Sequence, residues 1–468
     1  MRIIHTSDWH LGQYFYGKSR ANEHQQFLTW LLTQVKSHDI DAIIVAGDIF
    51  DTATPPSYAR QMYFNFISEI QSLNCQLVIL AGNHDSVSML AESKDLLSAL
   101  STRVIANVSD LDNNENLAEQ VFILQNSNKE PKAVICAVPF IRPRDVIKSQ
   151  QGQSASDKSL SLQQAIVNHY QALFEQAQQL VKESKLKLPI IATGHLTALG
   201  VTTSDSVRDI YIGTLEALPS NAFPAADYIA LGHIHRAQKV GKTEHIRYCG
   251  SPIALSFDEA KQSKRVLLVE FDSNHLTSVT DLIVPCFQPL AMVKTSLHEL
   301  SQAVETLLAE LNLNSENSKV LWLDIELTDS DRLSDLQSRI ETLVKDFPVE
   351  ILLVRRAKQV RQQLMAAQQD NSTLSELTLD DVFSSRLDQE EYFNPKGEKA
   401  TVVDSNESQP EVGVETDSGT SNEADIDKSI EAGIEKSTEE KKIDEHKKRL
   451  QSLFKQTVAQ VLAKGSAR

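Results

Sequence analysis

The sequence predicts an α/β protein with two layered units followed by C-terminal helices. From the first residue to about residue 272, short apolar runs rich in β-branched residues alternate with longer amphipathic stretches. A smaller alternation of the same kind occupies residues 285–356. Strands that alternate with helices along a chain indicate sheets covered by helices. With 468 residues, the chain is long enough for two or three domains with substantial cores.

The first unit, residues 1–275, contains candidate strands that are runs of four to six mainly apolar residues. They lie at residues 2–6, 42–46, 77–81, 133–138, 190–193, 228–231 and 266–271. Runs this short and this rich in Ile and Val favour buried strands over helix fragments. Between them we expect helices over residues 23–38, 58–72, 92–100 and 161–185.

The second unit, residues 285–356, has a compact βαβαβ pattern. Strands are expected over residues 290–294, 320–326 and 349–354, with helices over residues 297–311 and 331–345. It lacks the unusual polar motifs found in the first unit, so we predict an accessory α/β domain.

The composition changes beyond residue 357. An amphipathic helix is predicted within residues 372–393, where Leu379, Val382, Phe383 and Leu387 recur at helical spacing. Residues 395–440 contain no aromatic side chain, and such a segment cannot bury enough apolar surface to offset its ordering entropy. We therefore expect an acidic disordered insertion there, followed by a last amphipathic helix over residues 441–465.

The net charge of −17 is unevenly distributed. Residues 401–440 hold 12 acidic and 2 basic residues, which leaves −7 for the other 428 residues. Net charge governs solubility and long-range steering rather than what one cleft binds, so nucleic acid stays possible as a substrate. The cysteines are 61, 113 and 37 residues apart, with neither a disulfide framework nor a zinc-knuckle spacing. With no apparent secretory signal or membrane span, the expected location is a reducing cytoplasm.

Five candidate strands end in residues that commonly bind metal ions. These ends are Asp8-Trp9-His10, Gly47-Asp48, Gly82-Asn83-His84-Asp85, Gly194-His195 and Gly232-His233-Ile234-His235. Ligand sites of open α/β sheets lie at the carboxyl ends of the strands. Glycine, which precedes four of the five, allows the sharp turn and close backbone approach that such a site needs.

Carboxylate, imidazole and amide donors together suit Mn²⁺, Fe²⁺ or Zn²⁺ better than an all-oxygen magnesium site. One histidine after a strand is more often structural than a ligand. Five of the 13 histidines fall at these strand ends, however, beside acids and an asparagine in matching places. The sequence therefore predicts a two-metal site.

The ordered motifs D-x-H, G-D, G-N-H-D, G-H and G-H-x-H resemble the signature of the calcineurin-like metallophosphoesterases. The segments Thr6–Gly12, Gly47–Asp51, Gly194–Thr197 and Gly250–Pro252 are similar to the SbcD family, the nuclease subunits of the bacterial SbcCD complex. The resemblance covers most of residues 1–393. It implies a metallophosphoesterase sandwich with a smaller α/β capping domain and C-terminal helices.

The resemblance implies roles for individual residues. One metal would be held by Asp8, His10, Asp48 and His235. The second would be held by Asp48, Asn83, His195 and His233, with Asp48 bridging. His84 would be the catalytic histidine, stabilising the pentavalent phosphorus or protonating the leaving 3′-oxygen. Asp51 either supports a metal ligand or caps a turn, and Asp85 either orients a histidine or caps a turn.

The resemblance also implies an activity and partners. The expected activity is that of a Mn²⁺-dependent 3′→5′ exonuclease on double strands and an endonuclease on single strands and hairpins. The partners would be DNA and the ATPase SbcC, with a homodimer inside a heterotetramer. Basic residues near the motif loops, Lys18, Arg20, Arg142 and Arg144, could contact DNA phosphates or be ordinary surface charges.

Three alternatives stay open on the sequence. The chain could be a small-molecule or cyclic-nucleotide phosphodiesterase of the same fold. It could instead be a non-catalytic scaffold that holds DNA ends. The two C-terminal helices are either an SbcC-docking module split by the acidic insertion, or a docking helix followed by a variable tail.

Overall fold

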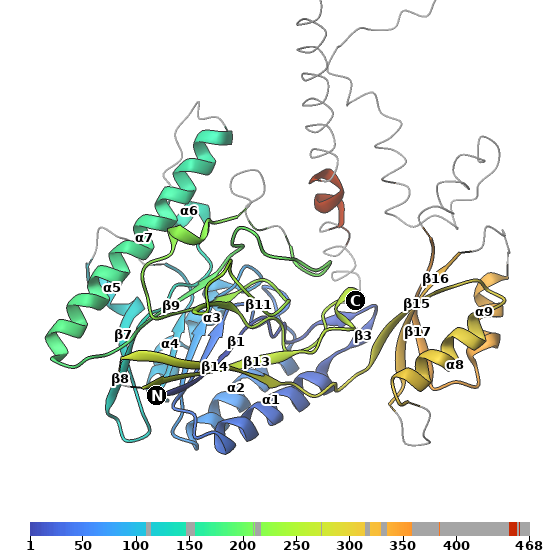
Figure 1. Ribbon diagram of the computed structural model, residues 1–468, viewed down its shortest axis with the longest axis horizontal. Coiled ribbons are helices and arrows are strands. Elements are labelled where there is room, and N and C mark those ends of the chain that lie inside the picture. Colours follow the sequence, from blue (N-terminus) through green and yellow to red (C-terminus); the bar gives the residue numbers. More distant parts are fainter. Residues whose placement is uncertain are drawn as a thin grey trace, which may run out of the picture. The chain divides into compact units, whose positions relative to one another are not determined.

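The computed structural model describes residues 1–108, 114–146, 155–208, 210, 217–272, 274–313, 319–328, 335–357, 383, 449–455 and 458 (Figure 1). The chain divides into two compact units, Met1–Gln363 and Leu364–Arg468. All sheets described below belong to the first unit. The predicted disordered segment 395–440 and most of the helix expected within 372–393 lie outside the described residues.

Two six-stranded sheets form the larger part of the first unit. The first has the order β14 (His275–Ile283), β13 (Arg265–Asp272), β1 (Arg2–Thr6), β4 (Ala42–Ala46), β5 (Gln76–Leu80) and β6 (Thr102–Ile105). The second has the order β11 (Gln238–Lys239), β12 (Ile246–Tyr248), β10 (Tyr228–Gly232), β9 (Ile190–His195), β8 (Pro131–Cys136) and β7 (Val121–Gln125). The strands β1, β4, β5 and β6 are parallel, as are β8, β9, β10 and β12, so their carboxyl ends lie at one edge of each sheet.

The two sheets pack face to face because their strands are apolar on both sides. In β4, Ala42, Ile44 and Ala46 join a core that also contains Ile135, Ile191 and Ala230 of the second sheet. Ile43 and Val45 point to the opposite face, as the period of two in a strand requires.

Helices cover the outer faces of both sheets (Figure 1). The helices α1 (Ala21–Ser37) and α2 (Ser57–Gln71) bury Phe27 and Phe66 against the first sheet. The long helix α7 (Ala155–Ser184) buries Tyr170 and Leu173 against the second. The predicted α/β layering is thereby confirmed. Shorter helices are α3 (Val87–Glu92), α4 (Lys94–Ser98), α5 (Asn114–Gln120), α6 (Pro143–Val146), η1 (Ser220–Ala222) and η2 (Phe257–Glu259).

The capping sheet has the parallel order β15 (Leu290–Thr295), β16 (Leu321–Leu327) and β17 (Val349–Arg356). Its helices α8 (Leu300–Glu310) and α9 (Leu336–Val344) pack on one face around Leu323 and Ile325. On the other face, Leu290 and Trp322 form a small apolar cluster with Phe15 and Phe257 of the larger domain. Phe15 belongs to the hairpin β2 (Tyr14–Phe15) and β3 (Lys18–Ser19).

Three sequence expectations bear on this architecture. All four cysteines are free; Cys75, Cys136 and Cys249 are buried, and Cys286 is exposed. None of the described helices has the length and apolar character needed to cross a membrane. Of the predicted helix 441–465, the structure describes residues 449–455 and 458, which are helical.

Candidate active site

The structure brings the predicted metal-binding residues together at the carboxyl ends of β1, β4, β5, β9 and β10. Asp8 and His10 follow β1, Asp48 follows β4, and Asn83 follows β5. From the second sheet come His195, the last residue of β9, and the pair His233 and His235 after β10. The six acidic and imidazole side chains in this set are at most 3% exposed. The site therefore lies where both sheets present the same edge.

Four of these residues have a backbone conformation that is uncommon outside glycine. The φ angle is 55° for Asp8, 48° for His10, 52° for Asp48 and 91° for His233. Non-glycine residues with positive φ are a few per cent of all residues, and they collect where a surrounding structure holds them in place. The backbone therefore turns where these strands end, and the turns bring the side chains together.

One group of donors consists of Asp8, His10 and His235, whose ligand atoms all lie within 4.8 Å of one another. Asp8 Oδ1 lies 4.0 Å from His235 Nε2. The rings of His10 and His235 are perpendicular neighbours with centroids 5.2 Å apart. This arrangement leaves two imidazoles and one carboxylate around a common centre.

A second group consists of Asp48, His195 and His233, with Asn83 against it. Asn83 Oδ1 lies 2.9 Å from His195 Nε2 and 3.1 Å from His233 Nδ1. Asp48 Oδ2 lies 3.3 Å from His195 Nε2 and 3.6 Å from His10 Nε2. The Asp48 carboxylate therefore stands between the two groups.

The unpaired polar atoms fit a pair of cations. His10 Nε2 and His233 Nε2 are buried and have no hydrogen-bond partner among the described residues. A buried imidazole nitrogen without a partner costs free energy, and such groups are rare unless they bind an ion or water. Imidazole, carboxylate and amide donors are those of transition-metal sites. The residues present thus fit two divalent cations with Asp48 between them.

Two glycines allow the strand ends to approach so closely. A Cβ atom on Gly82 would lie 2.1 Å from Asp48 Oδ1, and one on Gly232 would lie 1.9 Å from the carbonyl oxygen of Ala46. Real Cβ atoms essentially never come this near, so no larger residue fits at these positions without movement. Gly232 lets β10 lie against β4 across the sandwich, and Gly82 lets the loop after β5 lie against Asp48 within the first sheet.

Asp48 governs the electrostatics of the site. Burial alone would raise the pKa of Asp48, but His195, His84 and His10 hold that pKa well below its usual range. Burial lowers the pKa of His195, yet the Asp48 carboxylate outweighs it and raises the pKa to about 9. The metal-free site is therefore a set of ion pairs in which His195 carries a proton at neutral pH.

His84 occupies the rim of this cluster. Its backbone amide donates to Asp48 Oδ1 at 2.9 Å, and its Nδ1 donates to the backbone carbonyl of Asp51 at 2.7 Å. Its ring stands perpendicular to that of His10 with centroids 4.6 Å apart. Burial lowers the pKa of His84 to about 4, so the ring is neutral at pH 7. The Nδ1 bond leaves Nε2 with its lone pair available.

The structure distinguishes the roles of Asp51 and Asp85, which the sequence leaves open. Asp51 Oδ1 lies 3.2 Å from His10 Nδ1, on the side of the ring away from Asp48. The Asp85 carboxylate instead accepts from the amides of Ile49 at 3.1 Å, Phe50 at 3.0 Å and Gly82 at 2.8 Å. Asp51 can therefore fix the orientation of a histidine, whereas Asp85 ties two strand-end loops together.

Of the expected DNA contacts, Arg20 requires a correction. It is 1% exposed, forms a buried ion pair with Glu23 and donates to the carbonyl of Ala254 at 2.8 Å. Its guanidinium also lies 5.1 Å from the centre of the Phe15 ring. A side chain enclosed in this way cannot reach a phosphate, so the expected DNA contact at Arg20 is wrong.

The other three basic residues are differently placed. Lys18 pairs with Glu350 of the capping sheet. Arg142 donates from Nη2 to the backbone carbonyl of Asp85 at 3.1 Å and lies over the Phe140 ring. Arg144 is 78% exposed. Of these, Arg144 has the exposure that a phosphate contact requires.

Sequence reasoning missed a buried network behind His235. Glu259, in η2, is fully buried and lies 3.5 Å from His235 Nδ1. Ser206 lies between them, with its hydroxyl 2.6 Å from His235 Nδ1. Lys264 pairs with Glu259 from the other side. No motif or periodicity marks these residues; the only signal is an acid and a lysine near Gly250-Ser251-Pro252.

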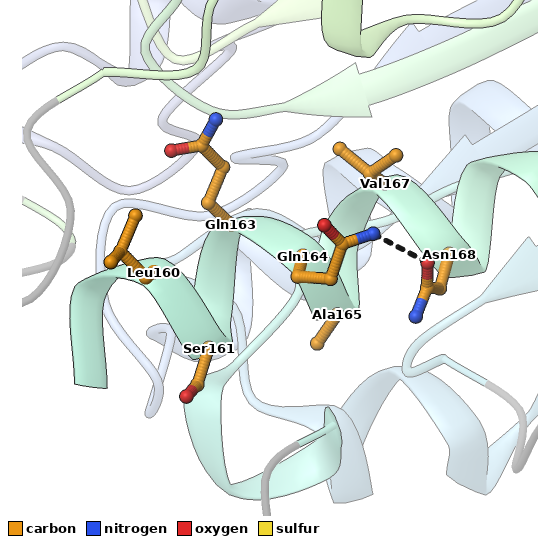
Figure 2. A pocket seen from close by; sticks show the side chains of 7 residues that line it. All are labelled: Leu160, Ser161, Gln163, Gln164, Ala165, Val167 and Asn168. Carbon is orange, nitrogen blue, oxygen red and sulfur yellow. Dashed lines mark hydrogen bonds between the residues drawn. The ribbon is translucent and has the colours of Figure 1, made fainter. Parts of the chain in front are cut away.

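A separate hollow lies along the first half of α7 (Figure 2). It is lined by neutral side chains of that helix between Leu160 and Asn168, where Gln164 donates to Asn168 at 2.8 Å. None of the lining residues carries an imidazole or a carboxylate, so this hollow is distinct from the metal-binding cluster.

Comparison with known proteins yields two family matches. Residues 1–237 match the family described as calcineurin-like phosphoesterase, which confirms the predicted fold class. Residues 286–391 match the family described as type 5 capsule protein repressor C-terminal domain, abbreviated SbcD_C.

The chain is also similar over most of its length to curated proteins. It is 50% identical over 391 residues to the SbcD subunit of nuclease SbcCD from Escherichia coli K12, covering 84% of this chain and 94% of that protein. For the corresponding SbcCD nuclease subunit of Bacillus subtilis the identity is 30% over 338 residues, covering 71% and 81%. A dimetal phosphatase structure from Danio rerio shares 10% identity, covers 61% of this chain and 98% of that chain, and has a TM-score of 0.32, which is too weak to carry an argument. On the sequence matches, the chain belongs to the SbcD family of nuclease subunits with a calcineurin-like phosphoesterase domain, and it is a metal-dependent phosphodiesterase.

Proposed function

We propose that this chain is the DNA-cleaving subunit of a complex with SbcC. It would act as a 3′→5′ exonuclease on double strands and an endonuclease on single strands and hairpins. The observation that carries the proposal is the convergence of Asp48 with two groups of buried donors and His84 at one edge of the sandwich. The relatives from Escherichia coli and Bacillus subtilis are both named as subunits of nuclease SbcCD, which supports DNA as the substrate.

In this proposal the two groups of donors would hold two Mn²⁺ ions. Asp8, His10, Asp48 and His235 would hold one, and Asp48, Asn83, His195 and His233 would hold the other. When bound, two such cations lower the pKa of a water molecule and stabilise charge on both the attacking and the leaving oxygen of a phosphodiester. Asp48 would contribute to both sites, because its Oδ2 lies 3.3 Å and 3.6 Å from ring nitrogens of the two groups.

His84 would act on the phosphodiester itself. Its Nδ1 is fixed by the carbonyl of Asp51, so the Nε2 atom is the one available to the substrate. The negative charge of a bound phosphate favours the protonated form of a neighbouring imidazole and so raises its pKa from about 4. Protonated His84 could then stabilise the pentavalent phosphorus or donate its proton to the leaving 3′-oxygen.

The test compares two substitutions. Replacing His84 with alanine should abolish cleavage of end-labelled duplex DNA in Mn²⁺ while leaving the bound metal unchanged. His84 is not among the proposed ligands, although a nitrogen of its ring lies within 4.8 Å of donor atoms of His10 and Asp48. Replacing Asp48 with asparagine should remove metal as well as activity. Metal content is measured by mass spectrometry and folding by circular dichroism. Near-wild-type cutting by the His84→Ala protein would contradict the assigned role.

The same assay separates the alternative functions when SbcC and ATP are included. Hydrolysis of a generic phosphodiester dye without DNA cleavage would favour a small-molecule phosphodiesterase. Binding of DNA ends with neither activity would favour a scaffold. The full set of donor side chains argues against the scaffold.

We further propose that the two C-terminal helices form a split module that docks on SbcC. Within the unit Leu364–Arg468, the rings of Phe383 and Phe454 are stacked with centroids 4.0 Å apart and an interplanar angle of 2°. This contact supports pairing of the two helices that flank the acidic segment. Apolar helix faces of this kind suit helix-in-groove binding.

Deleting residues 441–468 should weaken SbcC binding in a pull-down or by calorimetry. Phe454→Ala should reproduce part of the loss, because it removes one of the two stacked rings. Lys455→Ala, at an exposed neighbouring position, is the matched control. Unchanged affinity after the deletion would show that the last helix is a variable tail.

A further inference from the structure

Behind His235 lies a buried group of polar side chains that none of the proposed metal roles uses. Glu259 is 0% exposed, although a carboxylate is almost never fully buried unless it is paired. Its oxygens accept from the hydroxyl of Ser204 at 2.7 Å, the amide of Leu255 at 3.1 Å and the hydroxyl of Ser206. The hydroxyls of Ser251 and Ser256 also donate to Glu259, at 3.3 Å and 3.2 Å, and the Lys264 ammonium forms an ion pair with it.

The direction of the hydrogen bonds in this group is fixed by elimination. An ionised carboxylate only accepts, so the single proton of the Ser206 hydroxyl is directed to Glu259. The Ser206 oxygen, 2.6 Å from His235 Nδ1, must then accept from that nitrogen. His235 Nδ1 therefore carries a proton, which leaves Nε2, 4.0 Å from Asp8 Oδ1, as the ring nitrogen that can bind a cation.

We propose that Ser206 and Glu259 are positioning residues that hold His235 as a metal ligand through its Nε2 atom. The proposal rests on the proposed metal site. Carboxylates and other acceptors behind a ligating histidine fix its tautomer and ring orientation and raise its basicity. Here the acceptor is a serine hydroxyl polarised by a buried carboxylate. Lys264 ties this group to the backbone of His235, because its ammonium pairs with Glu259 and also donates to the carbonyl of His235 at 3.1 Å.

The chain offers a matched pair of substitutions. Ser204 and Ser206 lie two residues apart, donate to the same oxygen of Glu259 and have their hydroxyl oxygens 3.1 Å apart. Of the two, only Ser206 hydrogen-bonds to His235. Ser206→Ala should lower the affinity for one of the two Mn²⁺ ions by roughly tenfold to a hundredfold, the usual effect of losing such support. Ser204→Ala should leave both affinities near the wild-type values. Affinities are measured by calorimetric titration of the metal-free full-length protein with Mn²⁺.

A spectroscopic readout distinguishes positioning from a general loss of structure. Two-bond ¹H–¹⁵N spectra of protein labelled with ¹⁵N-histidine report which ring nitrogen carries the proton. In the metal-free wild type and in Ser204→Ala, His235 should show the Nδ1–H form, whereas Ser206→Ala should show a mixture of forms. His235→Asn identifies the signal.

The outcomes separate this proposal from the proposed metal site. If His235→Asn binds both Mn²⁺ ions normally, the ligand assignment itself is wrong. If His235→Asn loses one ion but Ser206→Ala matches Ser204→Ala in affinity and spectrum, the positioning role is overturned. Glu259→Gln provides a second variant, which should resemble Ser206→Ala because an amide cannot polarise the hydroxyl as a carboxylate does.

Discussion

The protonation of single residues controls how this site takes up cations. Burial lowers the pKa of His195, but Asp48 outweighs it and raises the pKa to about 9, so metal-free His195 is protonated at pH 7. A cation needs the imidazole lone pair, and its binding must displace this proton. The affinity for Mn²⁺ should therefore rise as the pH rises toward about 9 and fall under more acidic conditions.

Calorimetry in two buffers with different ionisation enthalpies measures this proton release directly. The apparent enthalpy of Mn²⁺ binding should differ between the buffers at pH 7.5, and His195→Gln should reduce the difference. The stability of the metal-free fold depends on pH in the opposite direction to the Mn²⁺ affinity. The His195–Asp48 pair stabilises the metal-free fold fully below the unfolded pKa of about 6.5, and this contribution declines as the pH rises through about 9. A binding enthalpy independent of buffer would contradict the prediction.

The surroundings of individual charged residues could not be predicted from the sequence. Arg20 and Arg144 are both basic residues near motif loops, yet one is enclosed by Glu23 and Phe15 and the other is 78% exposed. Glu259 gives no sign in the sequence that it lies against Ser206 and His235. These differences depend on contacts between distant segments, which neither residue type nor local spacing encodes.

At the scale of elements, the strands that hold the site were the most predictable. The bounds of β1 and β4 are those expected: β4 is a continuous apolar run buried on two faces, and β1 has Ile3 and Ile4 at its centre and is buried from Ile3 onward. The strand β14 escaped prediction because most of its residues are partly or fully exposed and no apolar run marks it. The expected helix 92–100 corresponds to the shorter α4, whereas α3, which Ser86 caps and Ser93 separates from α4, was not expected.

The motifs predicted that the donors follow strands, and parallel strands in two facing sheets explain why these donors meet. What the motifs could not give is the distance between the sheets. Gly232, the last residue of β10, sets that distance where its α-carbon meets the carbonyl of Ala46. The close approach of β10 and β4 is a property of the sandwich, not of either strand.

Gly232→Ala should therefore separate β10 from β4 and weaken metal binding. The added methyl would lie 1.9 Å from the Ala46 oxygen, which is backbone and cannot move as a flexible side chain would. We expect a large fall in thermal stability and in Mn²⁺ affinity. Gly241→Ala is the control, since a Cβ there meets nothing within 4 Å and its φ of +59° costs only about 1–2 kcal/mol. Equal effects from both substitutions would refute this interpretation.

For the whole molecule, we predict a homodimer formed through α2 and α4. Phe64 on α2 is 42% exposed and Leu96 on α4 is 70% exposed, whereas the adjacent Leu97 is in the core. The two helices pack on the adjacent strands β5 and β6, and contiguous exposed apolar patches are typical of protein interfaces. Light scattering of purified protein should give twice the mass of the chain.

Replacing both Phe64 and Leu96 with glutamate should convert this dimer to a monomer with unchanged secondary structure. Leu160→Glu is the matched control, because Leu160 on α7 is 66% exposed and distant in sequence from the predicted interface. A wild-type protein that is monomeric across the accessible concentration range would contradict the prediction.

The proposed ligands are divided between the two sheets. Asp8, His10, Asp48 and Asn83 follow strands of the first, while His195, His233 and His235 belong to strand ends of the second. Bound cations would cross-link the layers at this edge, in addition to the apolar contacts between them. Ions that bind only the folded state at a hundred times their Kd add about 2.7 kcal/mol to stability.

Chelation should then do more than stop catalysis. Removing the cations with EDTA should lower the melting temperature and speed amide hydrogen exchange at the ends of β4 and β10, while the interior of α7 keeps its protection. If exchange at these strand ends is insensitive to EDTA, the cations do not hold the layers together. If exchange there does respond to EDTA, loss of the cations weakens the packing of the two sheets. The supply of metal would then limit the lifetime of the folded protein as well as its activity.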